Sequence, residues 1–200
     1  MTESRLVLAS RSAARAALLR ANHVDFEVVP ARVDEAAVKE AMLADGAPGR
    51  DIADALAELK AQRVASRHPH RLVLGSDQVL VSNGRLFDKP ATLEEAREQL
   101  LALRGTTHEL LSAAVVFEDG HPVWRHVGRA QMIMRPFSDD FLERYILRHG
   151  DGLLATVGCY RLEEDGASLF SRVQGDYFSV LGLPLLEVLH FLRTRGILTE

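Results

Sequence analysis

The amino-acid sequence predicts a mixed α/β fold in which strands and helices alternate along the 200 residues. Short apolar runs such as 6–9 alternate with stretches like 13–22, whose apolar residues recur at helical spacing. Asn83-Gly84 lies between two extended segments and is a strong type I′ hairpin signal, so a purely parallel sheet is not expected. A chain that is 47% hydrophobic can bury one substantial core or two small lobes around a cleft, and we expect the lobes.

The first part of the chain contains two predicted strands and two predicted helices. In order, we expect a strand at 6–9, a helix from 13 to about 22, a strand at 26–29, a loop or short helix with Asp34 and Glu35, and a long helix after Asp51. The long helix is predicted because Ile52, Leu56 and Val64 recur at helical spacing, with Asp51 as its N-cap.

The middle of the chain is predicted to start with a buried strand at 72–74 that stops at Gly75-Ser76-Asp77-Gln78. This prediction places Asp77 at a strand end. Residues 79–87 then form the hairpin. Thr92 and Glu95 have capping-box spacing ahead of a helix that reaches Leu103.

The last part is predicted to contain two more strands and two more helices. Extended segments at about 107–117 and 122–134 are followed by a helix that begins at Ser138. A glycine-rich turn region and an apolar segment at 177–181 precede a final helix at 184–195.

Charge and cysteine content limit the functional classes. The net charge is −4 and no long Lys/Arg run is present, which argues against binding to nucleic acid or to a membrane surface but not against a small anionic ligand. The single cysteine, Cys159, has no internal disulfide partner and fits a reducing compartment. No apolar run approaches the ~18 residues of a membrane span. We therefore expect a cytoplasmic protein.

Two hydroxyl side chains and one cation surround the start of the first helix. Ser10 and Ser12 precede it, and Arg15 falls in its first turn, where the helix dipole disfavours a cation. Backbone N–H groups, hydroxyls and a guanidinium together are suited to bind phosphate oxygens. The alternative is that Ser12 is only an N-cap and Arg15 is solvated or ion-paired.

Two acidic residues are candidates for catalysis or metal binding. Asp77 follows a buried apolar strand, a position from which a carboxylate projects into the crevice beyond a sheet. The alternative is that this aspartate only forms a turn. Glu35 is less distinctive, and such a residue is more often a surface acid near a helix start.

Two lysines complete the candidate set. Lys60 lies between Leu56 and Val64 on or beside an apolar stripe, where snorkelling along the stripe is the commoner explanation. Lys89 follows the hairpin and precedes a proline, where an exposed loop lysine is the default. Acids, lysines and an arginine are together what metal-assisted hydrolysis of a phosphoanhydride requires. No Walker P-loop or dinucleotide fingerprint is present.

The order and spacing of these motifs resemble the Maf family over essentially the whole chain. The segments that carry the resemblance are Leu6-Val7-Leu8-Ala9-Ser10-Arg11-Ser12 with Arg15, Val33-Asp34-Glu35, Lys60-Ala61, Gly75-Ser76-Asp77, Asp88-Lys89-Pro90, Gly158-Cys159-Tyr160, Gly166-Ala167-Ser168-Leu169-Phe170, Gly175-Asp176-Tyr177 and Gly182-Leu183-Pro184-Leu185.

The resemblance implies one Maf/inosine-triphosphatase-like domain over residues 1–200, with a mixed sheet, two lobes and a deep cleft. It also implies hydrolysis of a nucleoside triphosphate to its monophosphate and pyrophosphate by a house-cleaning enzyme, with Mg²⁺ or Mn²⁺ as cofactor and frequently as a homodimer. It implies that Asp77 is a general base that also binds the metal and that Glu35 is a second metal ligand. The residues implied to bind the triphosphate are Ser10, Ser12, Arg15, Lys60 and Lys89.

Base specificity in the family is implied to depend on three positions, Ala14, Gln78 and Glu163. Gln78 after the aspartate, together with Glu163 where the pyrimidine branch usually carries glutamine, is similar to the branch that acts on 7-methyl-GTP. A carboxylate would accept hydrogen bonds from guanine N–H groups and would favour a cationic base. Ala14 departs from that branch, where a larger side chain is common. The alternatives are the dTTP/UTP branch and a non-catalytic nucleotide-binding regulator of septum formation.

Overall fold

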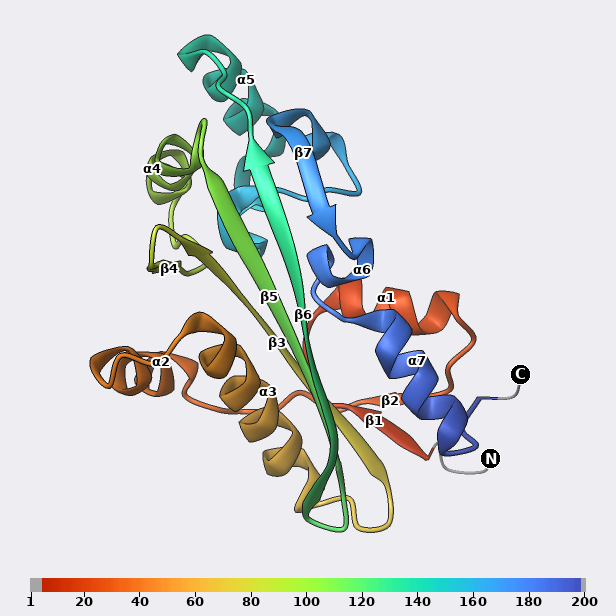
Figure 1. The fold of residues 1–200 in the computed structure, drawn as a ribbon. Helices are drawn as coiled ribbons and strands as arrows, with labels where there is room; N and C mark the ends of the chain where they lie inside the picture. Colours follow the sequence, from red (N-terminus) through yellow and green to blue (C-terminus); the bar gives the residue numbers. More distant parts are fainter. Residues whose placement is uncertain (1–4, 199–200) are drawn as a thin grey trace. The chain divides into compact units, whose positions relative to one another are not determined.

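The computed structural model describes residues 5–198 and has a mixed α/β fold, as the sequence predicts (Figure 1). Seven strands form one sheet in the order β2-β1-β3-β5-β6-β7, with β4 paired to β3. The strands are β1 Leu6–Leu8, β2 Glu27–Val28, β3 Leu72–Ser82, β4 Arg85–Phe87, β5 Thr107–Glu118, β6 His121–Met134 and β7 Phe170–Gly175. The helices are α1 Ala13–Ala21, α2 Glu35–Ala44, α3 Gly49–Ala65, α4 Leu93–Leu103, α5 Asp139–His149, α6 Tyr177–Val180 and α7 Leu185–Thr194, with short 3₁₀ turns at Gly150–Ala155, Val157–Cys159 and Asp165–Leu169.

The chain divides into two compact units. Unit 1 comprises residues 1–78, 111–128 and 176–200, and unit 2 comprises 79–110 and 129–175. Each unit is described separately below. The expectation of a deep cleft between two lobes stays a prediction.

Strand β3 is longer than the sequence predicted, and this changes the place of Asp77. The strand runs without a break from Leu72 to Ser82, so the prediction that it stops at Gly75 and leaves Asp77 at a strand end is wrong. Parallel pairing with β1 covers 72–74, antiparallel pairing with β4 covers 80–82, and residues 75–79 lie between these two pairings. A glycine inside a strand suggested an end, but here it marks a close approach of another backbone.

That close approach is between β3 and α3 in unit 1. A Cβ atom added to Gly75 would lie 2.1 Å from the carbonyl oxygen of Ala57 and 2.6 Å from the backbone nitrogen of Ala61. Alternate residues of a strand face opposite sides of the sheet, so Gly75 and Asp77 share the side that faces α3. Only glycine lets the helix backbone lie this close to the strand.

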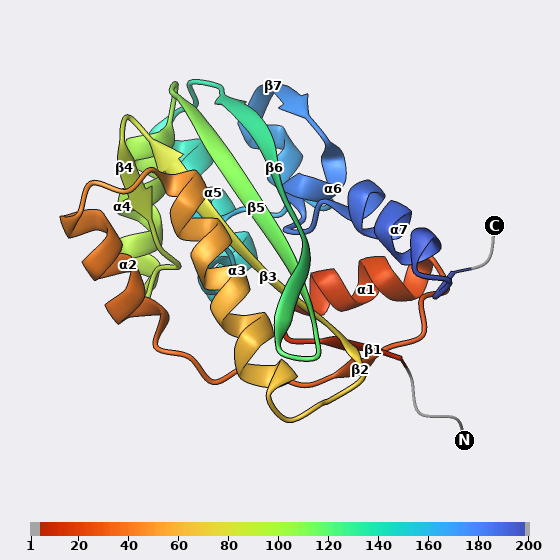
Figure 2. The same ribbon diagram turned by 60° about the horizontal axis from the view of Figure 1, so that its bottom comes forward.

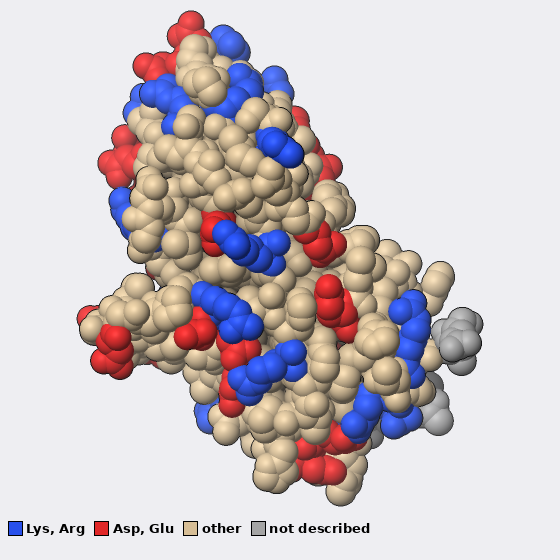
Figure 3. All heavy atoms as spheres, viewed as in Figure 1, with Lys and Arg blue, Asp and Glu red and all other residues tan. Residues whose placement is uncertain are grey.

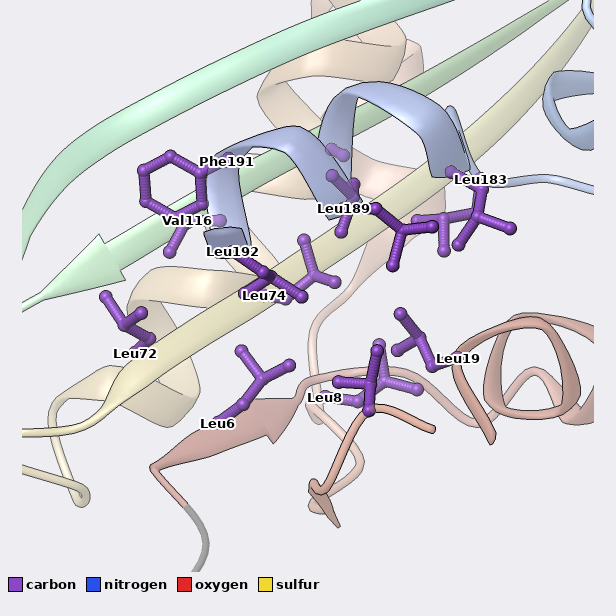
Figure 4. Close-up of a cluster of buried hydrophobic side chains, with 14 of the residues drawn as sticks. Leu6, Leu8, Leu19, Leu72, Leu74, Val116, Leu183, Leu189, Phe191 and Leu192 are labelled. Atoms are coloured by element: carbon purple, nitrogen blue, oxygen red, sulfur yellow. The ribbon is translucent and has the colours of Figure 1, made fainter. Parts of the chain in front are cut away.

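The opposite face of unit 1 carries a cluster of the unit's apolar core, which Figure 4 shows. Leucines of β1 and β3 pack there against side chains of α1 and α7, and both ribbon views place these two helices side by side (Figures 1 and 2). The buried members include Leu6, Leu8, Leu19, Leu72, Leu74, Val116, Leu183, Leu189 and Leu192. Removing these apolar side chains from water stabilises the unit.

Helix boundaries confirm most of the capping predictions and correct one. Ser12, Thr92 and Ser138 each accept a hydrogen bond from a backbone N–H three residues later, so all three are N-caps. Asp51 is not a cap, because α3 begins at Gly49 and Asp51 lies inside its first turn, where an acid complements the helix dipole. The predicted glycine-rich turn region near the C-terminus also contains a strand, β7.

Unit 2 confirms the predicted hairpin. Asn83 and Gly84 have φ values of 50° and 75°, as a type I′ turn requires, and they join β3 to β4. Cys159 is fully buried, and burial raises the pKa of its thiol to about 12, which fits a packing residue rather than a nucleophile.

Charges of both signs are interspersed on the molecular face drawn in Figure 3. Ion pairs join several of the protein's charged side chains, such as Arg125 with Asp54 at 2.6 Å and with Glu58 at 2.9 Å. Among the described residues, no helix is long and apolar enough to cross a membrane.

Substitution of Gly75 by alanine tests the close approach of β3 and α3. The new methyl group must displace helix backbone, so we expect a loss of about 3 kcal/mol or more in the free energy of unfolding. Denaturant titration measures it. The control is Gly152→Ala, because no atom lies within 4 Å of the added Cβ there. Equal stability of the two variants would contradict the observed packing.

Candidate active site

A cluster of one lysine and two carboxylates, of which Lys60 and Asp77 are buried, forms the centre of the candidate site in unit 1. The ammonium group of Lys60 lies 2.5 Å from Asp77 Oδ1 and 2.9 Å from Glu35 Oε1. Lys60 is 8% exposed and Asp77 5% exposed, whereas the Glu35 side chain is 43% exposed. The cluster therefore has one open side, at Glu35.

Three different elements position the cluster. Asp77 comes from the middle of β3, on the side that faces α3, and Lys60 comes from α3 itself. Glu35 is the first residue of α2, which is capped by the side chain of Asp34 through a 3.1 Å hydrogen bond from the N–H of Ala37. The alternatives of a turn-forming aspartate and a snorkelling lysine are both wrong, because the two side chains meet in a buried ion pair.

Arg15 is another buried cation of unit 1, and its guanidinium is held by two backbone carbonyls and a hydroxyl. Its Nε donates to the oxygen of Gly182 at 2.7 Å, and its Nη1 donates to the oxygen of Ser76 at 2.7 Å and to Ser10 Oγ at 3.1 Å. Burial lowers the pKa of Arg15, although Asp77 and Glu35 oppose this effect. An arginine stays charged nonetheless, so this site presents a positive charge.

The two serines before α1 have different partners. Ser12 Oγ accepts the N–H of Arg15 at 3.3 Å and acts as the helix N-cap. Ser10 Oγ accepts both the Arg15 guanidinium and the N–H of Ser12 at 3.2 Å. The alternative for Ser12, an N-cap, is confirmed, whereas a solvated or ion-paired Arg15 is wrong, since its direct partners are carbonyls and a hydroxyl.

Gln78 uses its amide nitrogen inside unit 1. Nε2 donates at 3.0 Å to Ser112 Oγ and to the carbonyl oxygens of Ser179 and Val180. No separate sequence signal marks Ser112 or Ser179, because single serines in apolar segments carry no motif. Gly182 was part of a recognised motif but had no assigned role.

The structure places the other predicted residues on separate segments. Ala14 is half-buried in the first turn of α1 in unit 1. Lys89 and Glu163 belong to unit 2, where both are exposed, Lys89 after β4 and Glu163 in a turn that follows Tyr160. Within this turn region, Glu164 pairs with Arg161 at 3.0 Å.

Tyr160 anchors the start of that turn. Its hydroxyl lies 2.7 Å from Nε2 of His108, a ring that is 1% exposed. Desolvation lowers the pKa of His108 to about 4, so the ring is neutral at physiological pH. The segment that contains Glu163 therefore starts at a residue, Tyr160, that is held by an uncharged hydrogen bond to His108.

The donor set around Lys60 fits a hard divalent cation. Mg²⁺ is usually bound by one or two carboxylates together with phosphate oxygens of the substrate, and Asp77 and Glu35 bring two carboxylates to one point. Among the described residues, no group of three or more His, Cys, Asp or Glu side chains forms a metal site. The pair of carboxylates is therefore suited to a metal that arrives with a phosphate ligand.

Comparison with known proteins identifies the family. The model of the family described as Maf-like protein matches residues 5–195. The chain belongs to this family. A relative from Caulobacter vibrioides is 53% identical over all of both chains, and it is named nucleoside triphosphate pyrophosphatase.

Further relatives of this Maf-family chain carry the same name. One from Ruegeria pomeroyi is 52% identical over 96% of this chain and 97% of its own. Another, from Granulibacter bethesdensis, is 49% identical over 98% and 99% of the two chains. The names of these relatives state the reaction class but no nucleotide base.

Replacement of Asp77 by asparagine tests the central carboxylate. Asparagine keeps an oxygen acceptor for Lys60 but is not a base, so we expect turnover of a nucleoside triphosphate to fall by about 10²- to 10⁴-fold. Pyrophosphate release measures the loss, and thermal melting checks that the variant is folded. Asp51→Asn on α3 is the control and should keep wild-type turnover. Retained turnover in Asp77→Asn would rule out a base at this position.

Proposed function

We propose that this chain hydrolyses a nucleoside triphosphate to its monophosphate and pyrophosphate, as a house-cleaning enzyme that removes a modified or surplus nucleotide. The observation that carries this proposal is the buried Lys60–Asp77 pair with Glu35 on its open side. Membership of the Maf family and the names of the relatives support the same reaction class.

Asp77 is proposed to be the general base. Lys60 occupies Oδ1 of this carboxylate, and we propose that Oδ2 orients the attacking water and takes its proton. The water oxygen bonds to the α-phosphorus while the bond from that phosphorus to the bridging oxygen breaks, and pyrophosphate leaves. Such reactions are promoted mainly by positioning and charge neutralisation, and no covalent enzyme intermediate is needed.

The positively charged groups are proposed to bind the triphosphate. Arg15 presents a buried charge whose direct partners are neutral, so a phosphate oxygen would add a counter-charge without displacing a carboxylate from it. Lys60, Lys89 and the hydroxyl of Ser10 are proposed to complete this set. Ser12 contributes through the start of α1, because its own oxygen already caps the helix.

A divalent metal, Mg²⁺ or Mn²⁺, is proposed to be held by Asp77 and Glu35 together with the substrate phosphates. When bound, it would neutralise charge on the phosphate oxygens. Lys60 already keeps the two carboxylates at one point, which is the arrangement that this binding needs.

We propose 7-methyl-GTP as the preferred substrate, with Glu163 as the residue that selects the base. An exposed carboxylate accepts hydrogen bonds from guanine N–H groups and favours the cationic methylated ring. The neighbouring Glu164 already pairs with Arg161, so Glu163 is the better candidate of the two acids. Gln78 and Ala14 are proposed to contribute to specificity from unit 1.

A nucleotide panel with Glu163→Gln tests the proposed base preference. With Mg²⁺, we expect pyrophosphate release to be fastest from 7-methyl-GTP among 7-methyl-GTP, GTP, dTTP, UTP and CTP. Loss of a charged hydrogen bond worth ~1.5–3 kcal/mol should reduce that preference by about 10-fold or more in Glu163→Gln. Glu164→Gln is the matched control and should leave the preference intact.

Each contrary outcome has a defined meaning. Fast turnover of dTTP and UTP by the wild type would refute the 7-methyl-GTP assignment and favour the pyrimidine branch. Tight triphosphate binding with no metal-dependent turnover would refute hydrolysis and favour a nucleotide-binding regulator.

A further inference from the structure

A network of hydrogen bonds next to Arg15 includes Gln78, which is proposed above to contribute to base specificity, but its other members have no role in the reaction described above. It lies entirely in unit 1 and joins the middle of β3, one residue of β5, and the turn that contains α6. Its centre is the carbonyl oxygen of Ser179. This oxygen accepts Ser112 Oγ at 2.7 Å, Gln78 Nε2 at 3.0 Å and the N–H of Gly182 at 3.1 Å.

Ser179 itself is fixed from its other side. Asp176 caps α6 and accepts both the N–H of Ser179 at 2.7 Å and its hydroxyl at 2.8 Å. A Cβ atom on Gly128 of β6 would lie 2.2 Å from the same hydroxyl, so β6 also packs against the Ser179 side chain. A carbonyl oxygen has two lone pairs, and three donors leave that of Ser179 little freedom to move.

Gly182 connects the Ser179 carbonyl to Arg15 through hydrogen bonds of its own backbone. Its N–H is bound to the Ser179 oxygen, and its own carbonyl accepts Arg15 Nε at 2.7 Å and Ser76 Oγ at 3.2 Å. Gly182 has a φ of +97°, and a Cβ there would lie 3.4 Å from Arg15 Nε. Only glycine adopts this backbone readily, so the residue places an acceptor against the guanidinium without a side chain.

Ser112 occupies a position that the apolar core does not explain. Ala114 and Val116 point to the same side of β5 as Ser112, since they follow it by two and four residues, and both belong to the apolar core of unit 1. Ser112 is fully buried, yet it is polar and donates to the Ser179 oxygen. If this position served packing alone, an alanine would suffice. A hydroxyl is needed to donate a hydrogen bond to the Ser179 carbonyl.

We infer that Ser112 is a positioning residue that acts through the Ser179 and Gly182 backbone to orient the Arg15 guanidinium toward the triphosphate. This inference rests on the proposed function only in that Arg15 binds phosphate. Ser112 contacts neither Arg15 nor the reacting atoms directly. Its effect should therefore depend on Arg15 and be independent of the base.

A double-mutant cycle between Ser112→Ala and Arg15→Lys tests the inference. Ser112→Ala removes a hydroxyl that donates to the Ser179 oxygen and accepts Gln78 Nε2, so it should lower kcat/KM about 5- to 10-fold, equally for all five nucleotides of the panel. In the Arg15→Lys background, which lacks the guanidinium donors, the same change should cause no further loss. The control is Ser82→Ala, a buried serine at the end of β3 whose hydroxyl has no partner among the described residues.

Affinity for inorganic tripolyphosphate, measured by calorimetry on the same four proteins, separates this inference from the proposed reaction. If the wild type binds it without hydrolysing nucleotides, the reaction is refuted, while a coupled affinity loss still supports the positioning role. The inference would be overturned if the losses caused by the two substitutions were additive, or if Ser112→Ala had the same kcat/KM as the wild type. An effect of Ser112→Ala that differed among the bases, or no binding of tripolyphosphate by the wild type, would overturn it too.

Discussion

Lys60 and Asp77 form a buried ion pair that requires α3 to lie against β3 at the closest distance that a glycine permits. Gly75 provides this distance two residues before Asp77, on the same side of the strand. A buried ion pair is a poor source of stability, because desolvation of both charges offsets their attraction. The pair is therefore better explained by chemistry than by folding, and Glu35 on its open side strengthens this explanation.

The alternation of β3 separates two tasks. Gly75 and Asp77 face α3, where Asp77 pairs with Lys60, whereas Ser76 and Gln78 point to the other side. There, the Ser76 hydroxyl and the Gln78 amide bind the turn that holds Gly182. One short strand segment thus holds the proposed general base on one side and the support of the buried arginine on the other.

Local sequence signals predicted much of this arrangement. N-caps at Ser12, Thr92 and Ser138 depend on neighbouring residues only, so they were predictable. The continuation of β3 through Gly75 depends on a helix distant in sequence and was not. The burial of Lys60 against Asp77 and the carbonyl cradle of Arg15 likewise arise from tertiary contacts, because the partners are separated by 17 and by 167 residues.

The central claim is that a water molecule, oriented by Asp77, attacks the α-phosphorus while the cations hold the departing pyrophosphate. The most direct test is turnover of a nucleoside triphosphate in ¹⁸O-labelled water, followed by mass spectrometry of the products. The account predicts that the label enters the nucleoside monophosphate and that pyrophosphate stays unlabelled. Label in the pyrophosphate, or release of single phosphate groups, would contradict it.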